Sequence, residues 1–335
     1  MPPERTLRPP TGSSIRAAWA TRRAVVSVTM KATATPALDR TMELAEGRTL
    51  AFSEWGVLDG RPIVLLHGTP GSRLMCPDID ATEAAGVRLI TIDRPGYGRS
   101  DPRPEQTLLT WVDDFIELAD HLDLPACPIV GWSGGGLYAL ASAYRLPERV
   151  TTIALAGSPG LTGEVPGALE ELSSEGRALI ELLHRDHAAG AAAIARHCQD
   201  YNGEGLFLPF KFRALPHTRR TERNRFMLSS GDADDQVAEG PGIAGAIQTW
   251  LAEGARQGSA GFVQDWVNRV DREGFGVADI RQDVHVWIGE EDRRISRFHA
   301  DYLVATIPRA RLYPLPGEGH RFLFAHWGDV LAALA

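Results

Sequence analysis

Short runs that would be apolar on both faces of a strand constrain the fold of this chain more than any other feature. Pro62 to Leu66, Val87 to Ile92 and Pro128 to Trp132 are such runs. Strands of this kind belong to parallel sheets that are covered by helices on both sides. The sequence therefore predicts an α/β protein with a buried, mostly parallel sheet.

Other segments complete this sheet and supply its helices. Further strands are expected at Met42 to Leu44, Thr49 to Phe52, Val150 to Ala156, Val284 to Ile288 and Arg311 to Leu315. The first two are separated by Glu46-Gly47-Arg48 and predict an opening hairpin. Apolar residues at helical spacing predict helices at Thr107 to Leu122 and at Leu137 to Arg145. The expected sheet has about eight strands.

Composition divides the chain into four parts. Residues 1–40 are rich in Arg, Pro, Ser and Thr, which predicts a disordered extension. An early start codon or a transit peptide are alternative interpretations of this part. Residues 41–158 and 281–335 carry the strands of the core. Residues 159–280 lack strand patterns and predict a helical cap or lid, with helices at Leu169 to His184, Ala188 to Gln199, Ala244 to Gln257 and Phe262 to Arg272.

Charge, hydropathy and cysteine content exclude several classes of protein. The net charge is -8, without a Lys/Arg cluster outside the extension, so nucleic acid is not an expected partner. No apolar run approaches the roughly 20 residues that cross a bilayer, so no membrane association is expected. Cys76, Cys127 and Cys198 lack the spacing of a metal site or a disulfide framework. We expect a cytoplasmic protein without metal or cofactor that acts on a small molecule. Its oligomeric state has no signal in the sequence.

Gly131-Trp132-Ser133-Gly134-Gly135 has the pattern G-x-S-x-G between a predicted strand and a predicted helix. In that context the pattern forms a tight turn that lifts a nucleophilic serine above the sheet. The glycines are needed because the turn leaves no space for side chains. Ser133 is therefore the predicted nucleophile, and the N–H of Gly134, at the start of the helix, is predicted to face developing negative charge. The alternative is a glycine-rich corner without catalytic function.

A second backbone donor is expected in the loop His67-Gly68-Thr69-Pro70-Gly71. The glycines allow a close approach to substrate, and Pro70 stiffens the loop. We expect the N–H of Thr69 to point at a developing oxyanion. His67 is predicted to anchor the loop through hydrogen bonds.

The base and the acid are expected after the last two strands. His320 lies in a polar turn after Arg311 to Leu315, whereas His326 is expected in the final helix, packed on the core. The turn Gly289-Glu290-Glu291-Asp292 follows Val284 to Ile288. Asp292 is the predicted acid because the chain turns before presenting its short side chain, while Glu290 and Glu291 are expected to be solvated. An acid in this position fixes the tautomer of the histidine.

These motifs, together with Asp93-Arg-Pro-Gly-Tyr-Gly-Arg-Ser100, resemble the α/β-hydrolase superfamily over roughly residues 42–335. The resemblance implies an α/β-hydrolase fold, a triad of Ser133, Asp292 and His320, an acyl-enzyme mechanism, no cofactor and a lid. The loop at Thr69 is also similar to the His-Gly-Gly-Pro-Gly of proline iminopeptidases, but Thr replaces the middle Gly. Ser at position 133 disfavours the relatives that use an aspartate nucleophile, the haloalkane dehalogenases and epoxide hydrolases.

The favoured hypothesis is hydrolysis of a small carboxylic ester or lactone. A proline iminopeptidase is the first alternative, and it would need carboxylates such as Glu170 or Glu171 to bind a substrate ammonium. A non-hydrolytic receptor or cofactor-free oxygenase is the second, because fold does not dictate function. Trp132 is expected either to line the pocket or to pack in the core, and the same two roles are open to Phe207, Phe210, Phe212 and Trp250.

Overall fold

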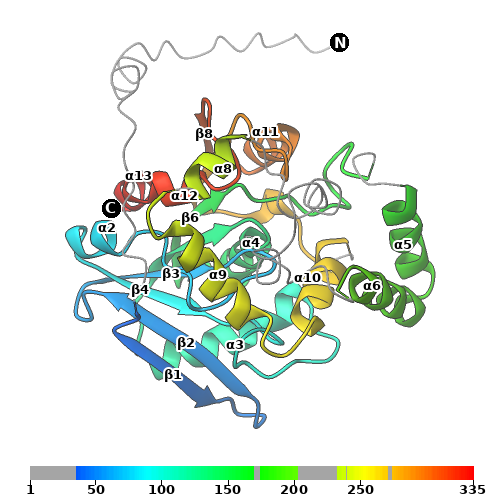
Figure 1. Ribbon diagram of the computed structural model, residues 1–335, viewed down its shortest axis with the longest axis horizontal. Helices are drawn as coiled ribbons and strands as arrows, with labels where there is room; N and C mark the ends of the chain where they lie inside the picture. Colours follow the sequence, from blue (N-terminus) through cyan, green and yellow to red (C-terminus); the bar gives the residue numbers. More distant parts are fainter. Residues whose placement is uncertain (1–34, 170–173, 203–231, 239, 271–273) are drawn as a thin grey trace.

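Eight strands form a single sheet in the computed structural model, which describes residues 35–169, 174–202, 232–238, 240–270 and 274–335 (Figure 1). The strands are β1 (Leu38–Glu43), β2 (Thr49–Gly56), β3 (Arg61–Leu66), β4 (Val87–Ile92), β5 (Cys127–Trp132), β6 (Val150–Ala156), β7 (Asp283–Gly289) and β8 (Ala310–Leu315). Their order across the sheet is β1-β2-β4-β3-β5-β6-β7-β8. β2 pairs antiparallel with β1 and β4, and the other pairs are parallel. The predicted mostly parallel sheet of eight strands is confirmed.

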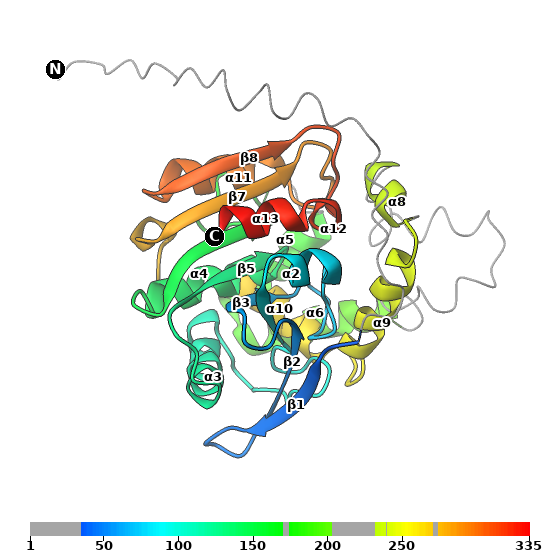
Figure 2. The same cartoon turned by 90° about the vertical axis from the view of Figure 1, so that its left-hand side faces the viewer.

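Helices cover both faces of this sheet, which explains the wholly apolar strands. Val64 and Leu66 of β3 contribute to the hydrophobic cluster on one face, and Ile63 and Leu65 contribute to the cluster on the other. The first face is covered by α3 (Leu108–His121), α4 (Gly135–Arg145) and α11 (Arg297–Thr306). The second is covered by α2 (Ile79–Ala84), α12 (Phe322–Ala325) and α13 (Trp327–Ala333) (Figure 2). Every second residue of a strand points to the same face, so both sets must be apolar.

The first strand begins earlier than the sequence pattern indicates. β1 starts at Leu38, before the predicted boundary at residue 41. Within it, the carboxylate of Asp39 binds Nε of Arg73 at 2.6 Å and Nη2 of Arg99 at 2.6 Å. These two contacts hold residues that composition alone places in the extension. The rest of the predicted extension, residues 1–34, lies outside the described residues.

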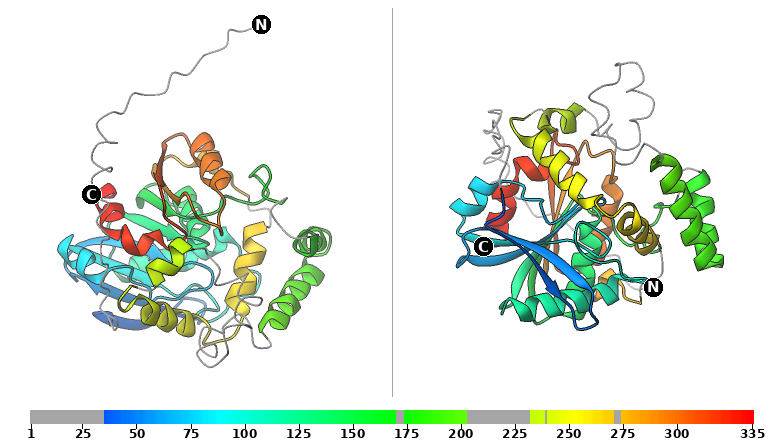
Figure 3. Two further views of the ribbon diagram at one scale, coloured as in Figure 1. Left: turned by 45° about the horizontal axis from the view of Figure 1, so that its top comes forward. Right: turned by 60° about the horizontal axis from the view of Figure 1, so that its bottom comes forward.

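Helices fill the segment between β6 and β7. They are α5 (Ser174–Arg185), α6 (His187–Asn202), α8 (Asp232–Ala238), α9 (Ile243–Gly254) and α10 (Ala260–Val270), followed by the 3₁₀ helix η2 (Val277–Asp279). We call this segment the helical insertion. Four of its helices overlap the four predicted ones, whereas α8 was not predicted because it is short and largely acidic. Figure 3 shows α5 and α6 side by side at a distance from the sheet, and their apolar side chains pack on α10. Glu170, Glu171, Phe207, Phe210 and Phe212 lie outside the described residues.

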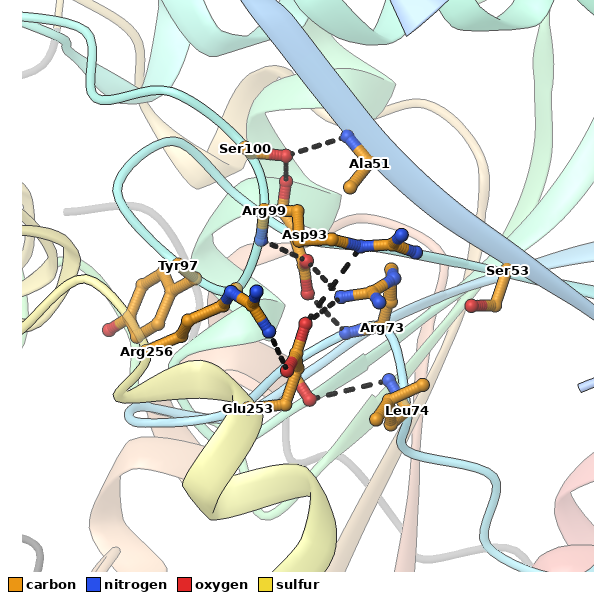
Figure 4. Close-up of polar contacts among 12 residues, drawn as sticks. Ala51, Ser53, Arg73, Leu74, Asp93, Tyr97, Arg99, Ser100, Glu253 and Arg256 are labelled. Carbon is orange, nitrogen blue, oxygen red and sulfur yellow. Dashed lines mark hydrogen bonds and ion pairs between the residues drawn. The ribbon is translucent and has the colours of Figure 1, made fainter. Parts of the chain in front are cut away.

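Charged and close-packed contacts attach α9 to the core. The guanidinium of Arg73 lies 2.7 Å from the carboxylate of Asp93 and 2.6 Å from that of Glu253 on α9 (Figure 4). The backbones also meet, because a Cβ at Gly254 would come within 2.2 Å of the carbonyl oxygen of Gly71. Loss of one partner in a buried ion pair costs about 3–5 kcal/mol, so these contacts hold α9 firmly. No helix of the described ranges is long and apolar enough to span a bilayer.

Candidate active site

Ser133 occupies a strained turn between β5 and α4. Its φ is 52°, a left-handed conformation that costs a residue with a side chain about 1–3 kcal/mol. The turn is tight, since a Cβ at Gly131 would lie 2.5 Å from Cα of Gly136, and one at Gly135 would lie 2.2 Å from the carbonyl oxygen of Leu66. Ser133 is partly exposed although its neighbour Trp132 is buried. The turn thus presents the Ser133 side chain above the edge of the sheet.

His320 and Asp292 form a buried pair. Nδ1 of His320 lies 2.7 Å from Oδ2 of Asp292, and the two side chains are only 5% and 1% exposed. The other oxygen of Asp292 accepts the N–H groups of Arg294 and Ile295 at 2.8 and 3.0 Å. Burial opposes the ionisation of Asp292, but His320 and these N–H groups outweigh it and lower the pKa of the carboxyl below its usual value. An ionised Asp292 accepts a hydrogen bond from Nδ1–H of His320, which leaves Nε2 unprotonated and able to act as a base.

The order of the strands brings these three residues to one edge. Ser133 follows β5, Asp292 follows β7 and His320 follows β8, and all these strands are parallel. Gly157, directly after β6, lies between them. A Cβ there would come within 3.1 Å of Nδ1 of His320 and 3.2 Å of Oδ2 of Asp292. Ala156, the residue before Gly157, accepts the N–H of Ser133 with its carbonyl oxygen at 2.9 Å. Gly157 was not among the predicted site residues, although a glycine directly after a central strand is a signal that the sequence contains.

The other candidates for the acid and the base make different contacts. Glu290 and Glu291 are exposed, and Glu290 faces Arg297 at 3.9 Å. His326 lies at the boundary between α12 and α13, as the N-cap of the final helix instead of within it, and its side chain is only 20% exposed. Its two ring nitrogens lie 3.1 Å from Asp329 and 3.3 Å from Glu318. These carboxylates outweigh the effect of burial and raise the pKa of His326.

Two backbone N–H groups lie close together beside Ser133. A Cβ at Gly134 would be 3.6 Å from the nitrogen of Thr69. The carbonyl oxygen of Gly68 accepts hydrogen bonds from Nδ1 of His67 at 2.7 Å and Nη2 of Arg94 at 3.2 Å. In a trans peptide unit the N–H points opposite to the carbonyl, so the N–H of Thr69 is directed away from Arg94. Within the part of the chain that the structure describes, no acceptor binds the N–H of Thr69 or Gly134. The pair is therefore available to an anion.

His67 lies beneath this loop as a neutral imidazole. Burial and the charge of Arg94 hold its pKa well below the usual range. Nδ1 donates to the carbonyl of Gly68, and Nε2 accepts the N–H of Arg94 at 3.4 Å. The ring also packs edge-on against Tyr97 with centroids 4.9 Å apart. Both nitrogens are thus occupied in holding the loop.

Trp132 lies next to the histidine in an aromatic cluster. Its Nε1 donates to the carbonyl oxygen of His320 at 3.3 Å, and the two rings are 5.5 Å apart. Trp250 of α9 and Phe324 of α12 pack against it at 5.7 and 5.8 Å. Trp132 is only 6% exposed, so packing and support of the His320 loop are its main contacts.

The described cysteines and acidic groups suggest no other chemistry. Cys76 and Cys127 are free and buried, and burial raises the pKa of these thiols to about 12 and about 11. Neither is a nucleophile at neutral pH, because the thiolate is the reactive form. In the described ranges, no three His, Cys, Asp or Glu side chains are grouped to hold a metal ion.

The sequence pattern of the alpha/beta hydrolase fold matches residues 61–326. The chain belongs to this family. A proline iminopeptidase of Arabidopsis thaliana is 31% identical over 119 residues, which are 35% of this chain and 31% of that protein. A non-heme chloroperoxidase of Streptomyces lividans is 35% identical over 121 residues, 34% of this chain and 43% of that protein. These matches thus span less than half of either relative.

Among solved structures, the esterase EaEST of Exiguobacterium antarcticum has a TM-score of 0.59 at 19% identity. The match covers 89% of this chain and 98% of EaEST. At this identity the likeness speaks for the fold. The sheet order and the helices on both faces are therefore those of an alpha/beta hydrolase, and membership of the family supports a hydrolase.

Proposed function

We propose that this alpha/beta hydrolase is a serine hydrolase that cleaves a small carboxylic ester or lactone through an acyl-enzyme intermediate. The observation that carries the proposal is the buried Asp292–His320 pair, with Nδ1 and Oδ2 2.7 Å apart, at the same sheet edge as the strained turn of Ser133. A serine hydroxyl is activated as a nucleophile by a neighbouring base, here His320, that is itself oriented by another group, here Asp292.

In the first half of the reaction, Nε2 of His320 takes the proton of the Ser133 hydroxyl as its oxygen attacks the substrate carbonyl. Asp292 holds the imidazole in the required tautomer and stabilises the imidazolium that forms. The tetrahedral oxyanion is bound by the N–H groups of Thr69 and Gly134. One such donor contributes about 3–4 kcal/mol to the transition state. The imidazolium then protonates the leaving alkoxide, which departs as the alcohol.

In the second half, His320 takes a proton from water, which attacks the acyl-enzyme carbonyl. The same two N–H groups bind the second oxyanion. Collapse of this intermediate breaks the bond to Ser133, His320 returns the proton to the serine, and the carboxylic acid leaves. A lactone gives a hydroxy acid in the same way, with the alcohol still attached to the acyl group.

We favour an ester or lactone as the substrate over a peptide with a free amino terminus, because an ester or lactone requires no site for an ammonium group. The carboxylates expected to bind an ammonium, Glu170 and Glu171, lie outside the described residues. Proline anilides therefore belong in the substrate panel. Their turnover in preference to esters would favour an iminopeptidase.

The test compares wild type with Ser133→Ala on p-nitrophenyl esters of increasing chain length, on lactones and on proline anilides. We expect wild type to hydrolyse esters or lactones, and the variant to lose a factor on the order of 10⁶ in kcat, as for other removed serine nucleophiles. Circular dichroism checks that the variant is folded. Equal activity of the two proteins on all substrates, or tight ligand binding with negligible turnover, would overturn the proposal.

A further inference from the structure

A buried arginine lies behind the loop that carries Thr69. Arg94 is 1% exposed and follows β4 directly. Its Nη1 donates to the carbonyl oxygen of His67, and its Nη2 donates to that of Gly68 at 3.2 Å. The carbonyl of Gly68 and the N–H of Thr69 belong to the same peptide unit and point in opposite directions. By binding this carbonyl, Arg94 keeps the N–H of Thr69 directed to the other side of the loop.

The counter-charge of Arg94 comes from the helical insertion. Oδ2 of Asp265, on α10, lies 2.5 Å from Nη2 of Arg94, and no other carboxylate of the described chain pairs with this arginine. Two tyrosines also donate to Asp265. The hydroxyl of Tyr97 reaches Oδ2 at 2.7 Å, and that of Tyr138 reaches Oδ1 at 2.6 Å. Asp265 is 6% exposed, so Arg94 and the two hydroxyls take the place of solvent around its carboxylate.

The fourth partner of Asp265 is Thr69, in the loop of residues 67–71, which we call the oxyanion loop. The hydroxyl of Thr69 donates to Oδ2 of Asp265 and lies 3.3 Å from Nη2 of Arg94. The same oxygen occupies the space above Gly134, since a Cβ there would come within 2.2 Å of it. One side chain thus connects both backbone donors to Asp265. We call Asp265, Arg94, Tyr97, Tyr138 and Thr69 the Asp265 cluster.

Close backbone packing holds α10 at the position that the cluster requires. A Cβ at Gly96 would be 2.8 Å from the nitrogen of Gly261, and a Cβ at Gly261 would be 2.6 Å from the ring of Tyr97. The first turn of α10 therefore contacts the turn after β4 without intervening side chains. A helix seated this closely places Asp265 with little freedom.

From these contacts we infer that Asp265 is a positioning residue for the oxyanion hole. It acts through Arg94 and the Thr69 hydroxyl, and it makes the geometry of the Thr69 and Gly134 N–H groups depend on the docking of α10. The inference rests on the proposed serine hydrolase function. A donor displaced by a fraction of an ångström loses much of its effect on a transition state while the ground state is bound almost as before.

The test is Asp265→Asn, which keeps the size of the side chain and removes its charge. We expect kcat to fall about 10- to 100-fold with KM within about twofold of wild type. The affinity for phenylboronic acid, which forms a tetrahedral adduct on an active serine, should fall by the same factor as kcat/KM. Tyr97→Phe, which removes one donor and leaves the charge, serves if the asparagine variant does not fold, with a smaller loss of the same kind.

Gln264→Ala is the matched control. Gln264 precedes Asp265 on α10, and its Nε2 donates to the carbonyl oxygen of Gln106 at 2.6 Å and to Oδ1 of Asn268 at 2.9 Å. Its side chain contacts neither Asp265 nor Thr69 directly and reaches Tyr138 only through Asn268. The Gln264→Ala variant should change kcat less than threefold. An equal loss of kcat in both variants, or a loss confined to KM, would overturn the inference.

A second readout does not depend on catalysis. Hydrogen exchange of the amides in residues 67–71, followed by mass spectrometry, should be faster in Asp265→Asn than in Gln264→Ala. Unchanged exchange would contradict the inference even if the protein hydrolysed nothing. Failure of the proposed function appears separately, as wild type and Ser133→Ala being equally inactive.

Discussion

Two buried carboxylates, Asp292 and Asp265, organise opposite sides of the same site. Asp292 lies on the loop after β7, is 28 residues from His320, and holds the imidazole with Oδ2. Asp265 lies on α10 of the helical insertion, is 196 residues from Thr69, and holds that residue's hydroxyl. Each has its remaining oxygen occupied by other donors. The proposed base, His320, is therefore oriented within the core, whereas the loop of Thr69 is oriented through the insertion.

The difference indicates what each part of the molecule contributes. The sheet edge alone brings His320 and Asp292 next to the Ser133 turn, through parallel strands in consecutive positions. The N–H groups that would bind the oxyanion additionally depend on a helix outside the sheet. On the proposed function, the helical insertion therefore contributes to transition-state binding.

Asp292→Asn tests the core side of the comparison and has the largest expected effect. It leaves the imidazole without its anionic partner and favours the wrong tautomer, so kcat should fall by about 10⁴. Because the pKa of Asp292 is lowered, its contribution to stability is present above about pH 4 and is lost as the pH falls through the folded-state pKa. Any fall in the kcat of wild type with decreasing pH that occurs above about pH 4 should therefore come from a group other than Asp292. Glu290→Gln, an exposed neighbour, should stay within twofold of wild type in the same ester assay.

Gly134→Ala alters the contact between the turn of Ser133 and the loop of Thr69. The new Cβ would lie 2.2 Å from the Thr69 hydroxyl oxygen and must displace that side chain. We expect a loss of about 10²- to 10³-fold in kcat, comparable to the removal of one oxyanion donor. Steady-state kinetics measures it. Activity near that of wild type would show that the Thr69 loop need not keep its position.

Tyr138→Phe weakens the contacts of Asp265 in the helical insertion and has the smallest expected effect. It removes the donor to Oδ1 of Asp265 and the acceptor of Asn268, at 2.6 and 3.1 Å. Burial next to Asp265 raises the pKa of Tyr138 well above its usual value, so the hydroxyl is a neutral donor at every working pH. We expect a stability loss of about 1.5–3 kcal/mol by urea titration and a less than tenfold loss in kcat. A larger kinetic loss than for Asp265→Asn would contradict the role given to the carboxylate.

The pairing of Asp292 with His320 could be predicted from local sequence pattern. Apolar runs such as 62–66 identify central strands because both faces are buried, and the residues of interest follow those strands directly. Asp292 could be chosen over Glu290 for the same reason, since the chain must turn before its side chain reaches a neighbour. Residues that directly follow buried strands can therefore be predicted from the sequence.

The other side depends on contacts that no local pattern contains. Asp265 lies in an amphipathic helix, where a charged residue is usually solvated. A weak signal was present, because Phe262, Asp265 and Asn268 recur at three-residue spacing on one face and are all buried. Its partners, Thr69 and Arg94, lie more than 170 residues away in the chain, so only the fold brings them together.

The role of Ser133 as an activated nucleophile is tested most directly by the site and rate of labelling with a fluorophosphonate, which reacts with such a serine without requiring a known substrate. Peptide mass spectrometry should locate the label on Ser133 in wild type. Labelling should be lost in Ser133→Ala, and it should be slowed in both Asp292→Asn and Asp265→Asn. A label on another residue, or equal labelling of wild type and Ser133→Ala, would contradict the assignment of Ser133 as the nucleophile.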